Sequence, residues 1–161
     1  MVSHIYFDWS GTLAKSHELR RKTSRNDTCK ILYSDVKTMI EYLYMSGYVL
    51  GMITNSDKDV HYLMNCLSKY GILQYFKGTI LVASMKGMKE KPSTVMFKKA
   101  MELDGVNPSN AVMVGNKYDV DVEGARRAGM KTVFIDRKKE GPRGKEDCYI
   151  RNILELGLYL K

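Results

Sequence analysis

The strongest constraint on the fold of this chain is a regular alternation of short apolar runs with longer segments whose apolar residues recur at helical spacing. The runs predicted to form strands are 5–7, 48–54, 78–84, 110–116 and 131–136. The segments predicted to form helices are 34–47, 56–71, 93–103 and 121–129. Two parallel strands need a crossover between them, and a helix supplies it. The pattern therefore predicts an α/β, three-layer Rossmann-like fold with a central, mostly parallel five-stranded sheet.

The predicted helices carry signals at their ends and along one face. Ser34 is a candidate N-cap for the first helix, and Gly47 fits its C-terminal stop. The inward face of the second helix is predicted to carry Val60, Leu63, Met64 and Leu67. A polar loop then follows the fifth strand, so that 136–161 is expected to form a loop and a closing element, either helix or strand.

The length of 161 residues fits one domain, which we expect to span 1–161. No apolar run approaches the length of a membrane span, so no membrane association is expected. The first residues, MVSHIYFDWSG, lack the basic region and longer apolar stretch of a secretory signal, which favours a cytoplasmic location. Cys29, Cys66 and Cys148 are odd in number and widely spaced, so we predict reduced thiols rather than a zinc site.

The chain is basic, with a formal net charge of +8, which favours anionic partners without naming one. Lys and Arg are concentrated in segment 15–30, directly after the first predicted strand and its turn. A charge run of this kind is more often a solvated loop than a binding surface. The segment is therefore only weak support for an anionic macromolecular partner.

The first apolar run ends at an acid, Asp8. A carboxylate at the end of a buried strand is unfavourable unless it is paired, hydrogen-bonded or used chemically. Gly11 permits a tight turn, whose free backbone N–H groups form a nest for an anion. A carboxylate beside such a nest suggests phosphoryl transfer, with Asp8 as the nucleophile and a cation to cancel the repulsion.

Polar residues also follow the other predicted strands. Thr54 and Asn55 follow the second, Asn116 the fourth and Asp136 the fifth. Right-handed crossovers place all the strand-to-helix loops at one edge of a parallel sheet, where ligands bind in such folds. We therefore expect these side chains to lie near Asp8.

Four segments, in this order, resemble the motifs of the haloacid dehalogenase-like superfamily, most of whose members are phosphatases. The first motif, Asp-x-Asp-Gly-Thr-Leu, corresponds to DWSGTL at 8–13, and the second, a Thr or Ser ending a strand, to Thr54 in ITNSD. The third, a Lys before Pro at the head of a helix, corresponds to KPSTVMFKKA at 91–100. The fourth, Gly-Asp followed by a further Asp, corresponds to VGNKYDVDVEGARRAG at 114–129. The resemblance covers nearly the whole chain.

The resemblance implies a role for each motif. Asp8 would attack phosphorus in line and form an aspartyl-phosphate. Lys91 would neutralise charge on the phosphate and on Asp8, a stabilisation that grows in the transition state. Lys86 and Lys89 are rival candidates, but only Lys91 precedes a proline. The implied phosphate-binding groups are Gly11, Thr12, Thr54, Asn55 and Lys91.

The same resemblance implies Mg²⁺, a hard ion that prefers oxygen ligands. Its implied ligands are Asp8, the backbone carbonyl of Ser10, Asn116 and Asp121, with Asp119 as an alternative from the fourth motif. The alternatives without a catalytic role are that Thr54 and Asp121 only cap helices and that Lys91 is a surface residue.

Two positions depart from the family pattern. The residue two after the nucleophile is usually an aspartate that acts as general acid and base, and here it is Ser10. Ser10 cannot take up and release a proton as a general acid and base at neutral pH, and loss of a positioned acid or base typically costs about 10²–10⁴-fold in rate. Asn116 stands where a metal-binding aspartate is usual, and its neutral amide would hold Mg²⁺ more weakly. Together they fit a slow or a degenerate enzyme.

The family's cap domain also has no room in either of its usual places. Segment 13–33 fits a short basic flap, and the interval 54–91 is already filled by a predicted helix and strand. A site without a cap suits a large phosphorylated partner, or a small substrate closed in by a neighbouring subunit of a homo-oligomer.

Three functions follow in order of support. The first is a Mg²⁺-dependent phosphohydrolase or phosphotransferase that acts slowly on a phosphomonoester through Asp8. The second is a binding or regulatory module with the same fold and no turnover, motivated by Ser10 and Asn116. The third is a nucleic-acid end phosphatase, suggested only by the basic segment 15–30.

Overall fold

The structure is a computed structural model that describes residues 1–16 and 29–160. Within this part of the chain a six-stranded sheet runs in the order β3-β2-β1-β4-β5-β6, and every neighbouring pair is parallel. Its strands are β1 (His4–Phe7), β2 (Val49–Thr54), β3 (Ile80–Val82), β4 (Ala111–Gly115), β5 (Lys131–Ile135) and β6 (Cys148–Ile150). The predicted α/β, Rossmann-like fold is confirmed.

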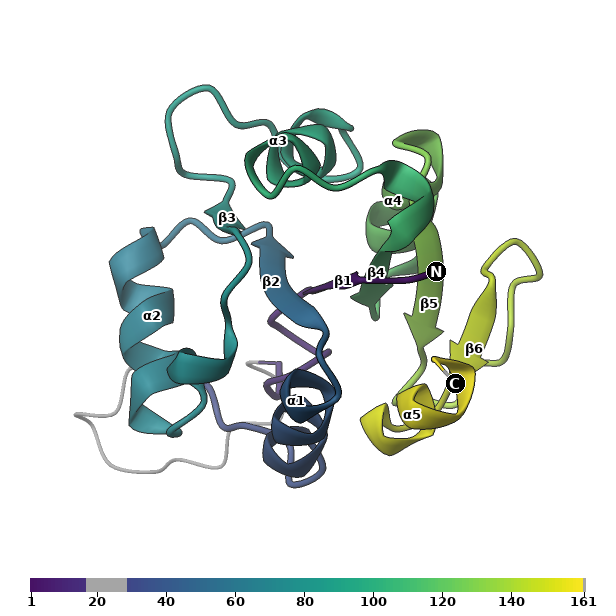
Figure 1. Cartoon of the computed structure of the whole chain (residues 1–161), viewed down its shortest axis with the longest axis horizontal. Helices are drawn as coiled ribbons and strands as arrows, with labels where there is room; N and C mark the ends of the chain where they lie inside the picture. The colour runs from purple at the N-terminus through teal and green to yellow at the C-terminus, as the bar shows by residue number, and fades with distance from the viewer. Residues whose placement is uncertain (17–28, 161) are drawn as a thin grey trace.

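Helices cover both faces of this sheet. They are α1 (Val36–Met45), α2 (Val60–Lys69), α3 (Val95–Leu103), α4 (Glu123–Arg127) and α5 (Leu156–Tyr159). Figure 1 shows α3 and α4 above the strands and α1 and α5 below them. One apolar core unites α1, α2 and α5 with the sheet, and a second unites α3 and α4 with its other face.

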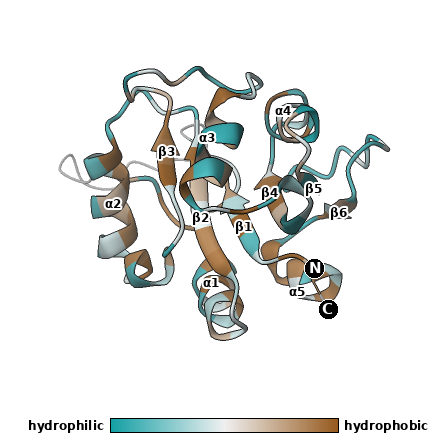
Figure 2. Cartoon of the chain, turned by 45° about the horizontal axis from the view of Figure 1, so that its top comes forward, coloured by the Kyte–Doolittle hydropathy of each residue, from teal (hydrophilic) through white to brown (hydrophobic). Residues whose placement is uncertain are grey.

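The short first strand contributes to both cores because its side chains alternate between the two faces. Ile5 and Phe7 lie in the core shared with α1 and α2, whereas Tyr6 lies in the core shared with α3. All three side chains are fully buried. In Figure 2 the strands are coloured mostly as hydrophobic, whereas the helices carry both hydrophobic and hydrophilic residues. This double burial explains why the run before Asp8 is continuously apolar.

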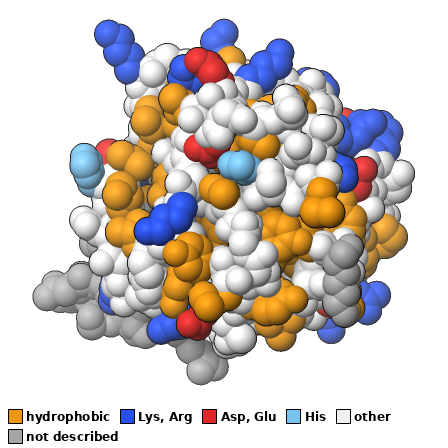
Figure 3. Space-filling model, viewed as in Figure 1, with side chains coloured by type: hydrophobic (Ala, Val, Ile, Leu, Met, Phe, Trp, Pro, Cys, Tyr) orange, Lys and Arg blue, Asp and Glu red, His pale blue; other side chains and the backbone are white. Residues whose placement is uncertain are grey.

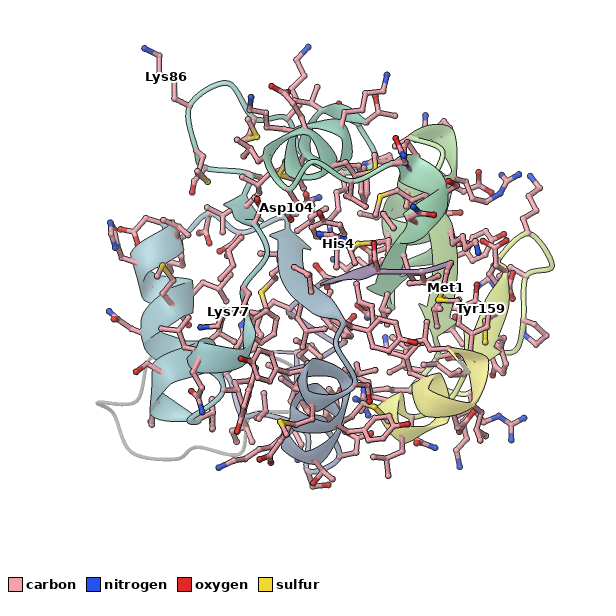
Figure 4. The ribbon with its side chains drawn as sticks, viewed as in Figure 1. Met1, His4, Lys77, Lys86, Asp104 and Tyr159 are labelled. Atoms are coloured by element: carbon pink, nitrogen blue, oxygen red, sulfur yellow. A yellow bond between two sulfur atoms is a disulfide. The ribbon has the colours of Figure 1, made fainter. Side chains whose placement is uncertain are left out.

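A hydrogen-bonded cluster at the far end of α3 holds β1 against that helix. The Tyr6 hydroxyl donates to Asp104 Oδ2 at 2.6 Å, and the Thr79 hydroxyl donates to Asp104 Oδ1 at 2.6 Å. Burial, reinforced by this carboxylate, raises the pKa of Tyr6 above its ordinary value. Figure 4 labels Asp104, which joins α3 to the segment before β3.

The sheet has one strand more than the five that we predicted. β6 pairs with β5 through Val133, Phe134 and Ile135. It is three residues long and follows a polar loop, so it carries too little periodic pattern to be assigned from sequence. The expected closing element therefore consists of both a strand, β6, and a short helix, α5.

Two details of the predicted helices are wrong. Ser34 is not the N-cap of α1, because that position is Asp35, whose side chain makes no capping hydrogen bond. Met64 of α2 does not face the core and is 36% exposed, whereas Cys66 is fully buried. The capping of α2 comes from Asp59, which accepts the N–H of Tyr62 at 2.8 Å.

The described ends of the predicted flap lie side by side. Lys15 N–H donates to the carbonyl of Ile31 at 2.7 Å, and Tyr33 N–H donates to the carbonyl of Leu13 at 3.0 Å. These bonds join the chain leaving the Asp8 turn to the chain returning to α1. The rest of the basic segment, 17–28, lies outside the described residues.

The prediction of reduced thiols is wrong for two of the three cysteines. Cys29 and Cys66 form a disulfide that closes a sequence separation of 37 residues, and Cys148 is free. The bond joins the flap's returning end to α2. Sequence spacing could not indicate it, because the two cysteines meet only after the flap folds against the helix.

Removal of this disulfide should destabilise the protein. Cys66→Ala should lower the free energy of unfolding by about 3–4 kcal/mol, because the open chain regains the entropy of a loop of this length. Denaturant unfolding with and without a reductant measures the effect. Cys148→Ala, which keeps the disulfide, is the matched control and should lose as much stability in the reductant as wild type, whereas Cys66→Ala should be unaffected by it; equal stability of oxidised wild type and Cys66→Ala would contradict the prediction.

Among the described residues, no helix combines the length and the hydropathy that crossing a bilayer requires.

Candidate active site

Asp8 follows β1 directly and lies at the edge of the sheet where the strands end. Its backbone N–H donates to the carbonyl of Val114 in β4 at 3.0 Å, which fixes the residue between two neighbouring strands. The residue is only 6% exposed. Oδ1 accepts a hydrogen bond from Lys91 Nζ at 2.9 Å, whereas Oδ2 has no hydrogen-bond partner among the described residues.

Lys91 is the centre of the site. Its Nζ donates to Asp8 Oδ1, to Asp121 Oδ1 at 2.6 Å and to the carbonyl of Ile53 at 2.7 Å. The residue is 3% exposed, so the interpretation as a surface lysine is wrong. Burial alone would lower the pKa of Lys91, but the carboxylates of Asp8 and Asp121 raise it above its ordinary value. The ammonium is therefore a fixed positive charge.

The rival lysines lie elsewhere. Lys86 and Lys89 are both exposed. Figure 4 shows Lys86 at the tip of its loop, pointing away from the molecule. Lys91 alone of the three reaches Asp8, in agreement with the choice made from its proline.

The backbone of Lys91 is held by the residue that follows Thr54. Asn55 Nδ2 donates to the carbonyl of Lys91 at 2.8 Å, and Lys91 N–H donates to Asn55 Oδ1 at 2.7 Å. This reciprocal pair joins the end of β2 to the segment before α3. The Asn55 side chain therefore positions Lys91, a function that the sequence did not indicate.

Asp121 approaches Lys91 from the fourth motif. It lies in a π-helical turn, Tyr118–Val122, and its Oδ2 accepts the backbone N–H of Lys117 at 3.0 Å. Burial, reinforced by the nearby Asp8 carboxylate, raises the pKa of Asp121 to about 6, although the Lys91 ammonium acts against this shift. A Cβ at Gly115 would overlap the Asp121 side chain, so this close approach requires glycine.

Thr54 ends β2 at the same edge. It is 4% exposed, and its hydroxyl has no hydrogen-bond partner among the described residues. A hydroxyl at this edge that makes no hydrogen bond to the described residues is free to donate one to a ligand. This observation favours a phosphate-binding role over helix capping, because α2 is capped by Asp59 instead.

The turn after Asp8 has a left-handed residue at Gly11, with φ of +85°. A Cβ there would overlap the Asn116 side chain. The Thr12 hydroxyl donates to Asn116 Oδ1 at 3.2 Å, and Thr12 is fully buried. Thr12 is therefore placed to hold Asn116, whereas the substrate contact predicted for it would require a change in this bond.

Asp136 ends β5 but does not join the Lys91 cluster. Its Oδ2 accepts the Gly141 N–H and the Tyr149 hydroxyl, each at 2.8 Å. Although burial raises the pKa of Asp136, these hydrogen bonds outweigh it and hold that pKa below its ordinary value. The carboxylate therefore holds the following loop against β6.

A divalent cation would find only oxygen donors here. The candidate ligand atoms are Asp8 Oδ2, which makes no hydrogen bond to the described residues, the backbone carbonyl of Ser10 and the amide oxygen of Asn116, which also accepts the Thr12 hydroxyl. This set fits a hard ion that keeps several waters. Both oxygens of Asp121 are already bonded, to Lys91 and to the Lys117 N–H. Among the described residues no cluster of three or more His, Cys, Asp or Glu could hold a metal.

A cavity of about 450 Å³ lies beside the site. Its lining runs from Ser10 and Asn116 to Tyr33 and Arg137. The Arg137 guanidinium lies 3.8 Å from the Tyr33 ring centre and pairs with Asp35 at 2.9 Å. Arg137 also donates to the carbonyl of Thr12 at 2.9 Å, so it ties the turn after Asp8 to the start of α1.

One further residue at the site was missed by the sequence analysis. Lys30 Nζ donates to the Ser10 hydroxyl oxygen at 2.6 Å. Lys30 belongs to the basic segment, where nothing distinguishes it from its neighbours, so only the fold of the flap could reveal this contact.

Comparison with known proteins identifies the family of this chain. Residues 9–135 match the family of haloacid dehalogenase-like hydrolases. A phosphoserine phosphatase of Thermus thermophilus is 28% identical over 150 residues, which cover 92% of this chain and 59% of that protein. A glyceraldehyde 3-phosphate phosphatase of Methanopyrus kandleri is 36% identical over 107 residues, which cover 66% of this chain and 44% of that protein.

A solved structure of a phosphatase is also similar to this chain. The crystal structure of a HAD phosphatase from Thermococcus onnurineus superposes with a TM-score of 0.73 at 33% identity. The match covers 81% of this chain and 58% of that one. The chain thus spans about half the length of the curated relatives that it matches.

Proposed function

Because the chain belongs to the haloacid dehalogenase-like hydrolase family, we propose that it is a phosphatase that hydrolyses a phosphomonoester through an aspartyl-phosphate on Asp8. The observation that carries this proposal is the state of the Asp8 carboxylate. One oxygen is held by Lys91, and the other, at the edge of the sheet, has no hydrogen-bond partner in the part of the chain that the structure describes. A buried carboxylate held in this way is oriented for attack, and its charge is compensated by the Lys91 ammonium group.

In the proposed reaction, Asp8 Oδ2 forms a new bond to phosphorus while the ester P–O bond breaks in line with it. The electron pair of that bond leaves with the ester oxygen. Lys91 stabilises the charge that spreads over the phosphoryl oxygens, and the Thr54 hydroxyl donates a hydrogen bond to one of them. Water then attacks the aspartyl-phosphate, which releases inorganic phosphate and restores Asp8.

The proposed cofactor is Mg²⁺, held by Asp8, the Ser10 carbonyl and Asn116. When bound, it would neutralise phosphoryl charge and help to orient the phosphate. Asp121, which was predicted as a ligand, is better placed to hold Lys91. With a single carboxylate in the ligand set, Mg²⁺ affinity should be lower than in a site with two.

Turnover should be slow, because no described acid occupies the position of the family's general acid and base. Ser10 at that position can donate a hydrogen bond but cannot remove a proton from the attacking water at neutral pH. The second step should therefore limit the rate, and the aspartyl-phosphate should accumulate.

The cavity beside Ser10 and Asn116 favours a small phosphomonoester, since its volume of about 450 Å³ is in the range of small-ligand sites. A macromolecular substrate and closure of the site by a second subunit stay proposals, as does a single domain without a cap. A nucleic acid has less support. On the face shown in Figure 3, Lys and Arg side chains of the described residues lie mostly near the outline.

A cytoplasmic location also stays a prediction. The Cys29–Cys66 disulfide weighs against it, because disulfides are uncommon in most reducing compartments.

Trapping the phosphorylated state tests the proposal. Wild-type protein incubated with p-nitrophenyl phosphate and Mg²⁺ should release p-nitrophenol slowly, and beryllofluoride, which mimics an aspartyl-phosphate, should stop the release. Rapid acid quench and mass spectrometry of peptides should find the phosphoryl group on Asp8. A protein that neither turns over nor becomes phosphorylated would instead support the binding or regulatory module.

The double substitution Ser10→Asp with Asn116→Asp distinguishes these two functions further. If the chain is a slow phosphatase, restoring an acid and a ligand carboxylate should raise turnover by about 10²-fold or more. A doubly substituted protein that folds, binds Mg²⁺ and still has no activity would favour the binding module.

A further inference from the structure

We propose that Lys30 is a positioning residue for the reaction: it holds the Ser10 hydroxyl so that its proton faces the oxygen of the departing group. This inference rests on the proposed function, since it assigns the group that assists departure at the same site. It explains how a chain with serine in place of the usual acid can still stabilise the leaving group. It also assigns a chemical task to one residue of the basic segment.

The contact itself is specific. Lys30 Nζ lies 2.6 Å from Ser10 Oγ, the length of a strong, charge-assisted hydrogen bond. An ammonium group can only donate, so Ser10 Oγ is the acceptor. The hydroxyl proton of Ser10 must therefore point away from Lys30. Ser10 also lines the cavity, together with Gly11 and Asn116. In the proposed reaction the leaving group lies in this cavity.

The position of Lys30 is set by several contacts of the surrounding backbone. Ile31, the next residue, accepts the N–H of Lys15 at 2.7 Å, which joins the two ends of the flap. The carbonyl of Lys30 accepts the Tyr70 hydroxyl at 2.8 Å. The preceding residue, Cys29, is bonded to Cys66 of α2. The segment that carries Lys30 is thus linked to α2 and the residue after it in two ways, by a disulfide and by a hydrogen bond.

The chemical effect follows from the charge. A hydroxyl whose oxygen accepts a bond from an ammonium group is a stronger donor, because hydrogen bonds in a chain polarise one another. As the ester P–O bond breaks, its electron pair stays on the departing oxygen, and the Ser10 O–H stabilises that charge. The departing oxygen then takes its proton from solvent water. Neither Ser10 nor Lys30 changes its protonation state.

This arrangement assists one half of the reaction. A hydrogen-bond donor stabilises the departing oxygen. The attack of water on the aspartyl-phosphate needs a base instead, and a hydroxyl that accepts a bond from an ammonium group cannot act as one. The structure therefore assigns Lys30 to the phosphorylation step. Its effect should appear in kcat/KM, which covers the steps up to departure of the leaving group, and should depend on the basicity of that group.

The test compares two substrates and four proteins. Lys30→Met should lower kcat/KM for O-phosphoserine, whose alkoxide is strongly basic, by about 10- to 100-fold. For p-nitrophenyl phosphate, whose leaving group needs little help, the decrease should be less than about threefold. Lys30→Arg, which keeps a donor and a charge, should recover part of the loss, and Lys98→Met, an exposed lysine of α3, is the matched control.

A double-mutant cycle separates this positioning role from a structural one. Ser10→Ala should reproduce the leaving-group dependence of Lys30→Met, and the two changes together should cost no more than either alone. Thermal unfolding of each variant checks that the fold is kept. An equal loss for both substrates, or additive losses in the double variant, would overturn the role of Lys30 while leaving the phosphatase intact. A wild type that phosphorylates Asp8 from neither substrate overturns the proposed function, and this role with it.

Discussion

Lys91→Met should abolish turnover and lower the free energy of unfolding by about 3–5 kcal/mol. The reason is that Lys91 is the shared partner of two buried carboxylates, Asp8 and Asp121, at 2.9 and 2.6 Å. Removing one member of a buried ion pair leaves an uncompensated charge, which is strongly destabilising. Denaturant unfolding measures the stability, and phosphatase assays measure the activity.

A second substitution identifies the cause of that loss. Asp121→Asn in the Lys91→Met background removes one of the two stranded carboxylates, so it should recover much of the stability and none of the activity. The matched control is again Lys98→Met, which removes an exposed lysine and should change stability by no more than about 0.5 kcal/mol. A Lys91→Met protein as stable as wild type would contradict the buried ion-pair geometry.

Asp8→Asn should abolish turnover with almost no loss of stability. An amide cannot form the acyl-phosphate, so phosphorylation and product release should both disappear. Stability should change by no more than about 1 kcal/mol, because Lys91 keeps Asp121 and the amide oxygen can still accept its hydrogen bond. The free energy of unfolding and the extent of phosphorylation by mass spectrometry give the two readouts.

The contrast between the two substitutions is diagnostic. Both should remove activity, but only Lys91→Met should lower stability. Lys91 neutralises two carboxylates, so losing one of these acids is less unfavourable than losing the lysine. Residual activity of Asp8→Asn comparable with wild type would show that another group is the nucleophile, and would overturn the proposed mechanism.

Much of the fold could be predicted from the sequence, because the apolar patterns of strands and helices each involve residues that are close together in the chain. Strand runs and helical stripes predicted five of the six strands and the α/β class, since parallel pairing requires the helices that alternate with them. The sixth strand and the exposure of Met64 escaped this reasoning. A three-residue strand has almost no periodicity. Met64 is in the middle of α2, between its buried and exposed faces, where a methionine fits either one.

The residues predicted to meet at one edge of the sheet share a geometric reason for doing so. Asp8, Thr54 and Asp121 each follow or terminate a parallel strand, or lie in the turn after one, and such residues meet at one edge of the sheet whatever the details of packing. Lys91 was identified by its proline, and the structure places it on Asp8 and Asp121. The chemical roles proposed for these residues await the experiments above.

The sequence by itself determined the class of fold, the edge at which chemistry could occur and the acid at its centre, because these depend on residues close together in the chain or on the direction of parallel strands. Only the tertiary structure decided that Lys30 lies on Ser10, that Cys29 joins Cys66 and that Asp121 holds Lys91. Those contacts depend on the path of the flap and on the burial of charge between separate elements. The periodicity of apolar residues in a sequence indicates neither the path of the flap nor where charges are buried.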